Sequence, residues 1–278
     1  MSDTIFPVKA TWTGGGLTSA DIGRRILEML QQLGPLDPAM SNWLLLNRPK
    51  SKWVTLSEAT PIMTALVERN VWRDDFSGRP DPDLGYGVVA KGSRVPSEFG
   101  ASDSINISMD IGSKWSNRLE FEVGDLLKPP DLSLVTYPIY KGALEALAAV
   151  WPCPWAYARA FTTTDDDVLE WDGVSPLEDL ISQAPEPRPP FETAWIAYLS
   201  APLAGGLTPP PEIASERTPG GGLILSAVRE RLDPANPEHM RRARMLQAIM
   251  TEQVGVERWT PSRPAAHAAN LPARVGSY

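Results

Sequence analysis

The 278 residues include a single cysteine, Cys153, and only two histidines. One cysteine excludes an intrachain disulfide and is typical of proteins that work in a reducing compartment. The sequence has no continuous apolar run of the roughly 18 to 20 residues that a membrane-spanning helix needs. The opening MSDTIFPVKATW lacks the basic segment followed by an apolar segment that marks a secretory signal. We therefore expect a cytoplasmic protein that does not engage the membrane.

Motifs of the common enzyme classes are also missing. The sequence contains no HExxH, no paired cysteines, no GxSxG and no GxGxxG, and the GGG at residues 14–16 lacks the GK[ST] ending of a phosphate-binding loop. We expect that GGG to form a plain turn. Acidic pairs such as Asp74 and Asp75 could serve as general acid and base, but any acidic chain offers such pairs. The prediction is therefore a protein without enzymatic activity, cofactor or metal, with a carboxylate-dependent hydrolase as the alternative.

The chain is acidic, with 34 acidic and 26 basic residues and a net charge of −8. This balance argues against direct nucleic-acid binding, which usually requires a basic face. It suits a basic protein partner, because complementary charge steers association, although such a charge also serves solubility. Ten tryptophans are present. We expect most of them in the core and one or two at the surface as candidate binding anchors.

Hydrophobic periodicity indicates both helices and strands. Alternating apolar residues at 105–111 and 119–123 predict two strands of a sheet that is wet on one face, joined by a hairpin. Further strands are predicted at 4–12, 84–92 and 220–228, and helices at 19–33, 61–70 and 138–150, while 194–199 is a short apolar run. Thr18 or Ser19 caps the first helix and Thr60 the second. The pattern predicts an α+β fold with a mostly antiparallel sheet and helices packed on one side. Residues 1–250 form one domain, and 251–278 a Pro/Ala-rich tail.

One segment gathers residue types found in active sites, namely Asp233, Asn236, Glu238 and His239. A local explanation accounts for their spacing. Asn236 suits an N-cap, and Pro237 suits the first helical position, where its missing N–H would have no partner in any case. Glu238 matches the positive end of the helix dipole. We therefore interpret the segment as a helix start rather than a catalytic loop.

A second polar segment offers a candidate binding site. The stretch TTTDDDVLEWDGVSPLEDL, at residues 162–180, places one tryptophan among carboxylates. Charge runs are usually solvated loops, but an aromatic anchor within charge is common at interfaces. The candidate partner-binding residues are Asp165, Asp166, Asp167, Glu170, Trp171 and Asp172.

Four stretches resemble a known family in their order and spacing. The first runs from a strand containing Trp12 through a helix to LGPLDPAMSNW, which ends at Trp43. The others are AVWPCPWA, which ends at Ala156, TAWIAYLSAPL at 193–203, and GGGLILSAVRERLDPANPEHMRRARML, which begins at Gly220. Together they resemble the immunity protein 52 family of bacterial polymorphic-toxin systems. The resemblance spans about residues 5–250 and leaves out the acidic stretch 165–190.

The resemblance implies binding rather than catalysis, and it carries over no catalytic residues. Such proteins are antidotes to a toxin encoded beside them. The usual partner is a nuclease effector with a restriction-endonuclease-like domain, often delivered by a type VI secretion system. A nuclease that grips DNA needs a basic groove, which an acidic protein can cover. The chain is therefore expected to neutralise a cognate toxin by steric and electrostatic occlusion, while a block of toxin assembly stays open.

Overall fold

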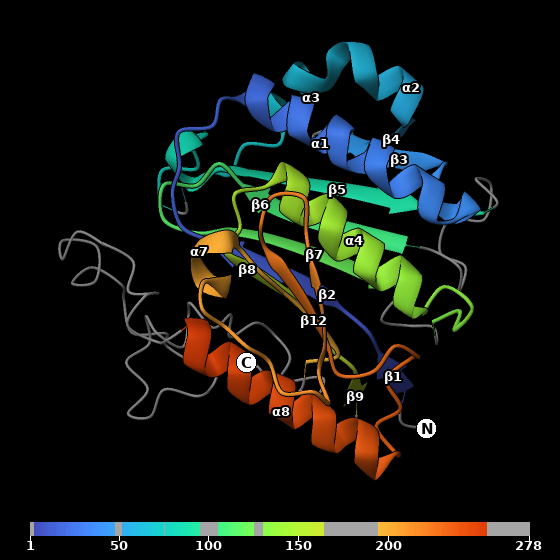
Figure 1. The fold of residues 1–278 in the computed structure, drawn as a ribbon. Coiled ribbons are helices and arrows are strands. Elements are labelled where there is room, and N and C mark those ends of the chain that lie inside the picture. The colour runs from blue at the N-terminus through green and yellow to red at the C-terminus, as the bar shows by residue number, and fades with distance from the viewer. Residues whose placement is uncertain are drawn as a thin grey trace, which may run out of the picture.

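The computed structural model describes residues 3–47, 52–74, 76–94, 105–124, 130–163 and 194–254 (Figure 1). Within these ranges the chain forms one ten-stranded sheet and one two-stranded pair, and all the strand pairs are antiparallel. In spatial order the large sheet runs β11 (Ala214–Arg217), β12 (Leu223–Ser226), β10 (Ile196–Leu199), β8 (Trp155–Ala158), β2 (Val8–Trp12), β7 (Asn117–Val123), β6 (Ile105–Ile111), β5 (Tyr86–Gly92), β3 (Trp43–Asn47) and β4 (Lys52–Thr55). The small pair joins β1 (Asp3–Ile5) to β9 (Phe161–Thr163). The predicted α+β class and antiparallel sheet are confirmed.

Helices α1 (Ser19–Leu33), α3 (Met63–Arg69) and α4 (Tyr137–Val150) lie on one side of this sheet (Figure 1). The alternating apolar side chains of β6 and β7 point toward them and are buried. Phe121 of β7, for example, meets Tyr140 of α4 edge to face, with ring centroids 5.8 Å apart. Each such side chain contributes about 1.5–3 kcal/mol by leaving water. This layer is the main core.

Helix α8 (Pro237–Val254) lies on the other side of the sheet from α1 and α4 (Figure 1). All residues of β8, β10 and β12 are buried, so both faces are covered at that end of the sheet. Ala243, Leu246 and Met250 are the fully buried residues of α8. The helix continues past residue 250, where the tail was expected to begin, and residues 255–278 lie outside the described ranges.

Local sequence signals explain where the first helix begins. Thr18 is the N-cap of α1, and its hydroxyl accepts a hydrogen bond from the backbone N–H of Asp21. The Asp21 carboxylate accepts from the Thr18 N–H in return, which completes a capping box. The predicted bounds of this helix are confirmed.

The second predicted helix begins earlier than expected. Its first turn is α2 (Leu56–Ala59), capped by Thr55 in a capping box with Glu58, and not by Thr60. A 3-10 turn at Thr60–Ile62 then separates α2 from α3. Pro61 lies in that turn, where its missing N–H interrupts the helical hydrogen bonds. The T-x-x-E pattern was the stronger start signal.

Candidate functional site

The candidate partner-binding residues from the sequence, Asp165 to Asp167, Glu170, Trp171 and Asp172, lie outside the residues that the structure describes. Their role therefore stays a prediction. The structure does describe the two ends that flank them. Before the segment, β9 ends at Thr163, which pairs with Asp3. After it, the backbone N–H of Trp195 donates to the Ala158 carbonyl.

A largely polar surface lies across the middle of the large sheet, on the face turned away from α1 and α4. The strand register places its side chains on one face, and most of them are half-buried, whereas their neighbours on the opposite face are buried. We call this surface the open face; its members are Lys9, Thr11, Val89, Lys91, Asn106, Ser108, Asp110, Arg118, Glu120 and Glu122.

An ion network occupies the centre of the open face. Lys9 Nζ lies 2.9 Å from Glu120 Oε1, and the Arg118 guanidinium donates to the other oxygen of the same carboxylate. The Lys9 and Glu120 side chains are 16% and 12% exposed, so water screens the pair weakly. These three groups carry a formal charge of +1, which the other charged members of the open face, Lys91, Asp110 and Glu122, bring to zero for the surface as a whole.

Burial and ion pairing shift the pKa values of Lys9 and Glu120 in opposite directions. Burial lowers the pKa of Lys9, and the Arg159 and Arg118 charges add to this effect, while Glu120 opposes it. Burial tends to raise the pKa of Glu120, but Lys9 and Arg118 outweigh it and hold that pKa below its ordinary value. The Glu120 carboxyl group is therefore ionised at neutral pH.

One tryptophan borders the open face. Trp72 is 38% exposed and donates its indole N–H to Asp110 Oδ1 at 3.2 Å. Its ring lies directly over Gly87 of β5, where an added Cβ would come within 2.6 Å of the ring. A side chain at position 87 would therefore displace the indole. The sequence predicted one or two exposed tryptophans without saying which.

Beyond Trp72 the chain makes a tight turn that returns at Asp81, whose N–H donates to the Trp72 carbonyl. The Asp74 carboxylate accepts from the N–H groups of Phe76 and Ser77, and the Asp74 carbonyl accepts from Gly78. The Phe76 ring is 83% exposed, the highest value among the large apolar residues described. We call residues 72–74 and 76–81 the Phe76 turn.

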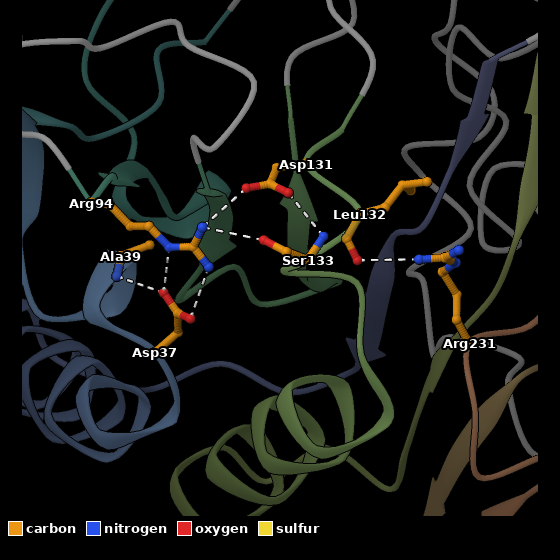
Figure 2. Close-up of polar contacts among 7 residues, drawn as sticks. All are labelled: Asp37, Ala39, Arg94, Asp131, Leu132, Ser133 and Arg231. Atoms are coloured by element: carbon orange, nitrogen blue, oxygen red, sulfur yellow. Dashed lines mark hydrogen bonds and ion pairs between the residues drawn. The ribbon is translucent and has the colours of Figure 1, made fainter.

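A second polar cluster ties together loops at one end of the sheet (Figure 2). Arg94, which follows β5, donates two hydrogen bonds to the Asp37 carboxylate, at 3.2 and 3.1 Å, and a third to Asp131 at 3.1 Å. Ser133 receives another bond from the same guanidinium. Next to them, Leu132 is 45% exposed. These groups bind one another, so the cluster holds loops in place.

His239 lies in the first turn of α8, as the helix-start interpretation predicted. The Asn236 side chain accepts from the N–H groups of Glu238 and His239 and so caps the helix. His239 Nδ1 accepts from the Asp233 N–H, and Nε2 lies 3.1 Å from Glu230. Its ring is thus held by local partners. Nearby, hydrogen bonds from Arg241 and Arg242 lower the pKa of Glu238 to about 2.

Two negative findings apply to the described part of the chain. It contains no group of three or more His, Cys, Asp or Glu residues placed to hold a metal ion. None of its helices combines the length and apolar character needed to cross a bilayer. In the GGG loop, Gly15 packs tightly, since a Cβ on it would lie 2.8 Å from the Lys114 Cα, whereas Gly14 and Gly16 have open space around them and a positive φ. Close packing thus accounts for Gly15.

Comparison with known proteins finds solved structures with a similar fold. No protein-family model matches the chain, and no curated protein matches it. Among solved structures the chain is similar to the "Pseudomonas aeruginosa T6SS protein PA0821", at a TM-score of 0.52 and 13% sequence identity. The alignment covers 90% of this chain and 73% of that one. This likeness shows a shared fold, and membership of the immunity protein 52 family stays a prediction.

Sequence reasoning missed the two features that distinguish the surface. The Lys9–Glu120 pair joins residues more than a hundred positions apart, and no local pattern announces such a pair. The exposed Phe76 had a weak local signal, because DDFSG contains turn-forming residues on both sides of the aromatic ring. That signal identifies a turn, but only the folded structure shows that the Phe76 ring is exposed to solvent.

Proposed function

We propose that this protein is an immunity protein of a type VI secretion system, which binds a cognate toxin and neutralises it. The observation that carries the proposal is the fold shared with a T6SS protein along 90% of the chain. The motif order that resembles the immunity protein 52 family supports the same role. A protein of this kind acts by covering a surface of its partner and needs no reaction of its own.

A nuclease effector is the partner class that the charge distribution favours. Residues 165–192 hold nine acidic residues and one basic residue, so this segment carries a net charge of −8, equal to that of the whole chain. The other 250 residues are neutral in sum. Concentrated negative charge complements the basic groove with which a nuclease holds DNA. We propose that Asp165, Asp166, Asp167, Glu170, Trp171 and Asp172 contact the toxin and that occlusion of its groove inhibits it.

The direct test is binding to the toxin encoded by the neighbouring gene. The full-length chain is immobilised, and a catalytically inactive variant of that toxin is passed over it. We expect a Kd of nanomolar order, as is common for specific complexes of standard interface size. Failure to bind at micromolar toxin would contradict the proposed function.

Charge reversal tests whether the acidic segment attracts the toxin electrostatically. Replacing Asp165, Asp166 and Asp167 together with lysine should slow association by about tenfold or more and weaken its dependence on salt. A matched control makes the same change of net charge at dispersed exposed positions, with Glu28→Lys, Glu212→Lys and Glu252→Lys. If both variants slow association equally, net charge matters but the segment is not the contact.

A further inference from the structure

The Phe76 turn holds a large apolar ring in solvent on an ordered support. Several internal hydrogen bonds fix its backbone, including Gly78 N–H to the Asp74 carbonyl at 2.8 Å and Arg73 Nη1 to the Gly78 carbonyl at 2.8 Å. Gly78 has a φ of +64°, a left-handed conformation that glycine adopts without strain. Within the described part of the chain, no other large apolar residue is as exposed as Phe76.

The base of the turn is fixed to the sheet as well. The Trp72 N–H donates to the Gly85 carbonyl at 2.9 Å, and the Trp72 indole binds Asp110 on the open face. The ring of Phe76 is therefore carried by a support that is hydrogen-bonded at its tip and packed at its base. A group held this way loses little conformational freedom on binding.

We propose that Phe76 is an anchor that inserts into an apolar pocket of the toxin. This inference rests on the proposed function and adds a second contact, separate from the acidic segment. The Phe76 turn contains the residue types that are enriched at interface centres, aromatic residues and arginine, alongside aspartates and a serine that are typical of turns. Its described residues include Trp72, Phe76, Arg73 and Arg79, and neither lysine nor glutamate.

The charges of the turn favour a protein pocket over a phosphate-rich partner. Residues 72–81 carry two arginines and three aspartates, a net charge of −1. DNA or an anionic membrane would require a basic surplus around the aromatic group. A small molecule would require a concave site on this chain, whereas a single protruding ring fits a concave site on the partner. The occupant is therefore a folded protein, which the proposed function identifies as the toxin.

The test compares Phe76→Ala with Leu132→Ala in binding to the inactive toxin encoded by the neighbouring gene. Leu132 is the matched control because it is also an exposed apolar residue, on the loop beside Arg94. We expect Phe76→Ala to raise Kd about 30-fold, mainly through faster dissociation, as for an interface hot spot. Leu132→Ala should stay within about twofold of the unmodified protein. Because both side chains are exposed, both variants should keep the original thermal midpoint.

The outcomes separate this inference from the proposed function. If the unmodified protein binds the toxin and Phe76→Ala binds it equally well, Phe76 is not an anchor, and the proposed function stands. If the unmodified protein does not bind the toxin, both fail. Binding to duplex DNA or to phosphatidylglycerol vesicles that is lost in Phe76→Ala would also overturn the proposed occupant.

Discussion

Lys9 and Glu120 face each other across the β2–β7 strand pair, with Nζ 2.9 Å from Oε1. The two residues are direct register partners, so the backbone ladder itself brings the charges together. Both side chains are mostly buried on a sheet face whose other neighbours are polar. Removing one charge would leave the other desolvated without its counter-ion, which is more costly than losing an exposed ion pair.

We expect Glu120→Gln to lower the free energy of unfolding by about 2–3 kcal/mol at pH 7. Urea denaturation at 25 °C measures it, with Glu28→Gln on the exposed side of α1 as a control that should change little. The double variant Lys9→Met, Glu120→Leu should recover much of the loss, because it removes both buried charges and leaves only Arg118, whose side chain is 35% exposed, without the carboxylate. A loss below 0.5 kcal/mol in Glu120→Gln would show that the pair contributes little to stability.

The difference in stability between the unmodified protein and Glu120→Gln should also depend on pH. The pKa of Glu120 is lower in the folded protein than in the unfolded chain, where it lies near 4.5. The stabilisation that ionised Glu120 gives to the fold is therefore fully present above pH 4.5, and it is lost as the pH falls through the pKa of the folded state. The stability gap between the unmodified protein and Glu120→Gln should therefore narrow below about pH 4.5. Denaturation curves from pH 7 down to pH 3 measure this gap. A gap that is constant over that range would mean that Glu120 does not titrate as its surroundings require.

Asn117 joins the β6–β7 hairpin to the GGG loop. Its side chain accepts from the Gly112 N–H at 2.6 Å and donates to the Gly14 carbonyl at 2.6 Å, and the residue is buried. Asn117→Ala leaves these groups without partners, so we expect a loss of about 2–3 kcal/mol. Asn236→Ala, which removes the half-buried N-cap of α8, should cost about 1 kcal/mol. Equal losses in the two variants by urea denaturation would contradict this role of Asn117.

Cys153 should be unreactive in the native protein. Its thiol is buried, and burial raises its pKa to about 12, so almost no thiolate exists at pH 8. We expect reaction with an aromatic disulfide reagent to be at least a hundredfold slower in buffer than in 8 M urea. Because this is the only cysteine, the absorbance change reports on it alone. Rapid labelling without denaturant would show that this part of the core opens readily.

The sequence by itself determined the local elements of this protein. The alternation at 105–111 and 119–123, the bounds of α1 and the Asn236 cap follow from contacts within a few residues, so the pattern contains the information needed. The helix that was misplaced is a local error as well, because the capping box at Thr55 and Glu58 was readable in the sequence.

Only the tertiary structure decided which side chains are exposed to solvent and which are covered by other elements. Three features join segments that are distant in the chain: the pairing of Lys9 with Glu120, the cover that α8 gives to the end of the sheet formed by β8, β10 and β12, and the packing of Trp72 on Gly87. A side chain's exposure depends on what packs against it, and that is set by strand order and register rather than by neighbours in sequence. For this reason composition predicted that some tryptophan would be exposed, while the fold alone placed Trp72 and Phe76 at the surface.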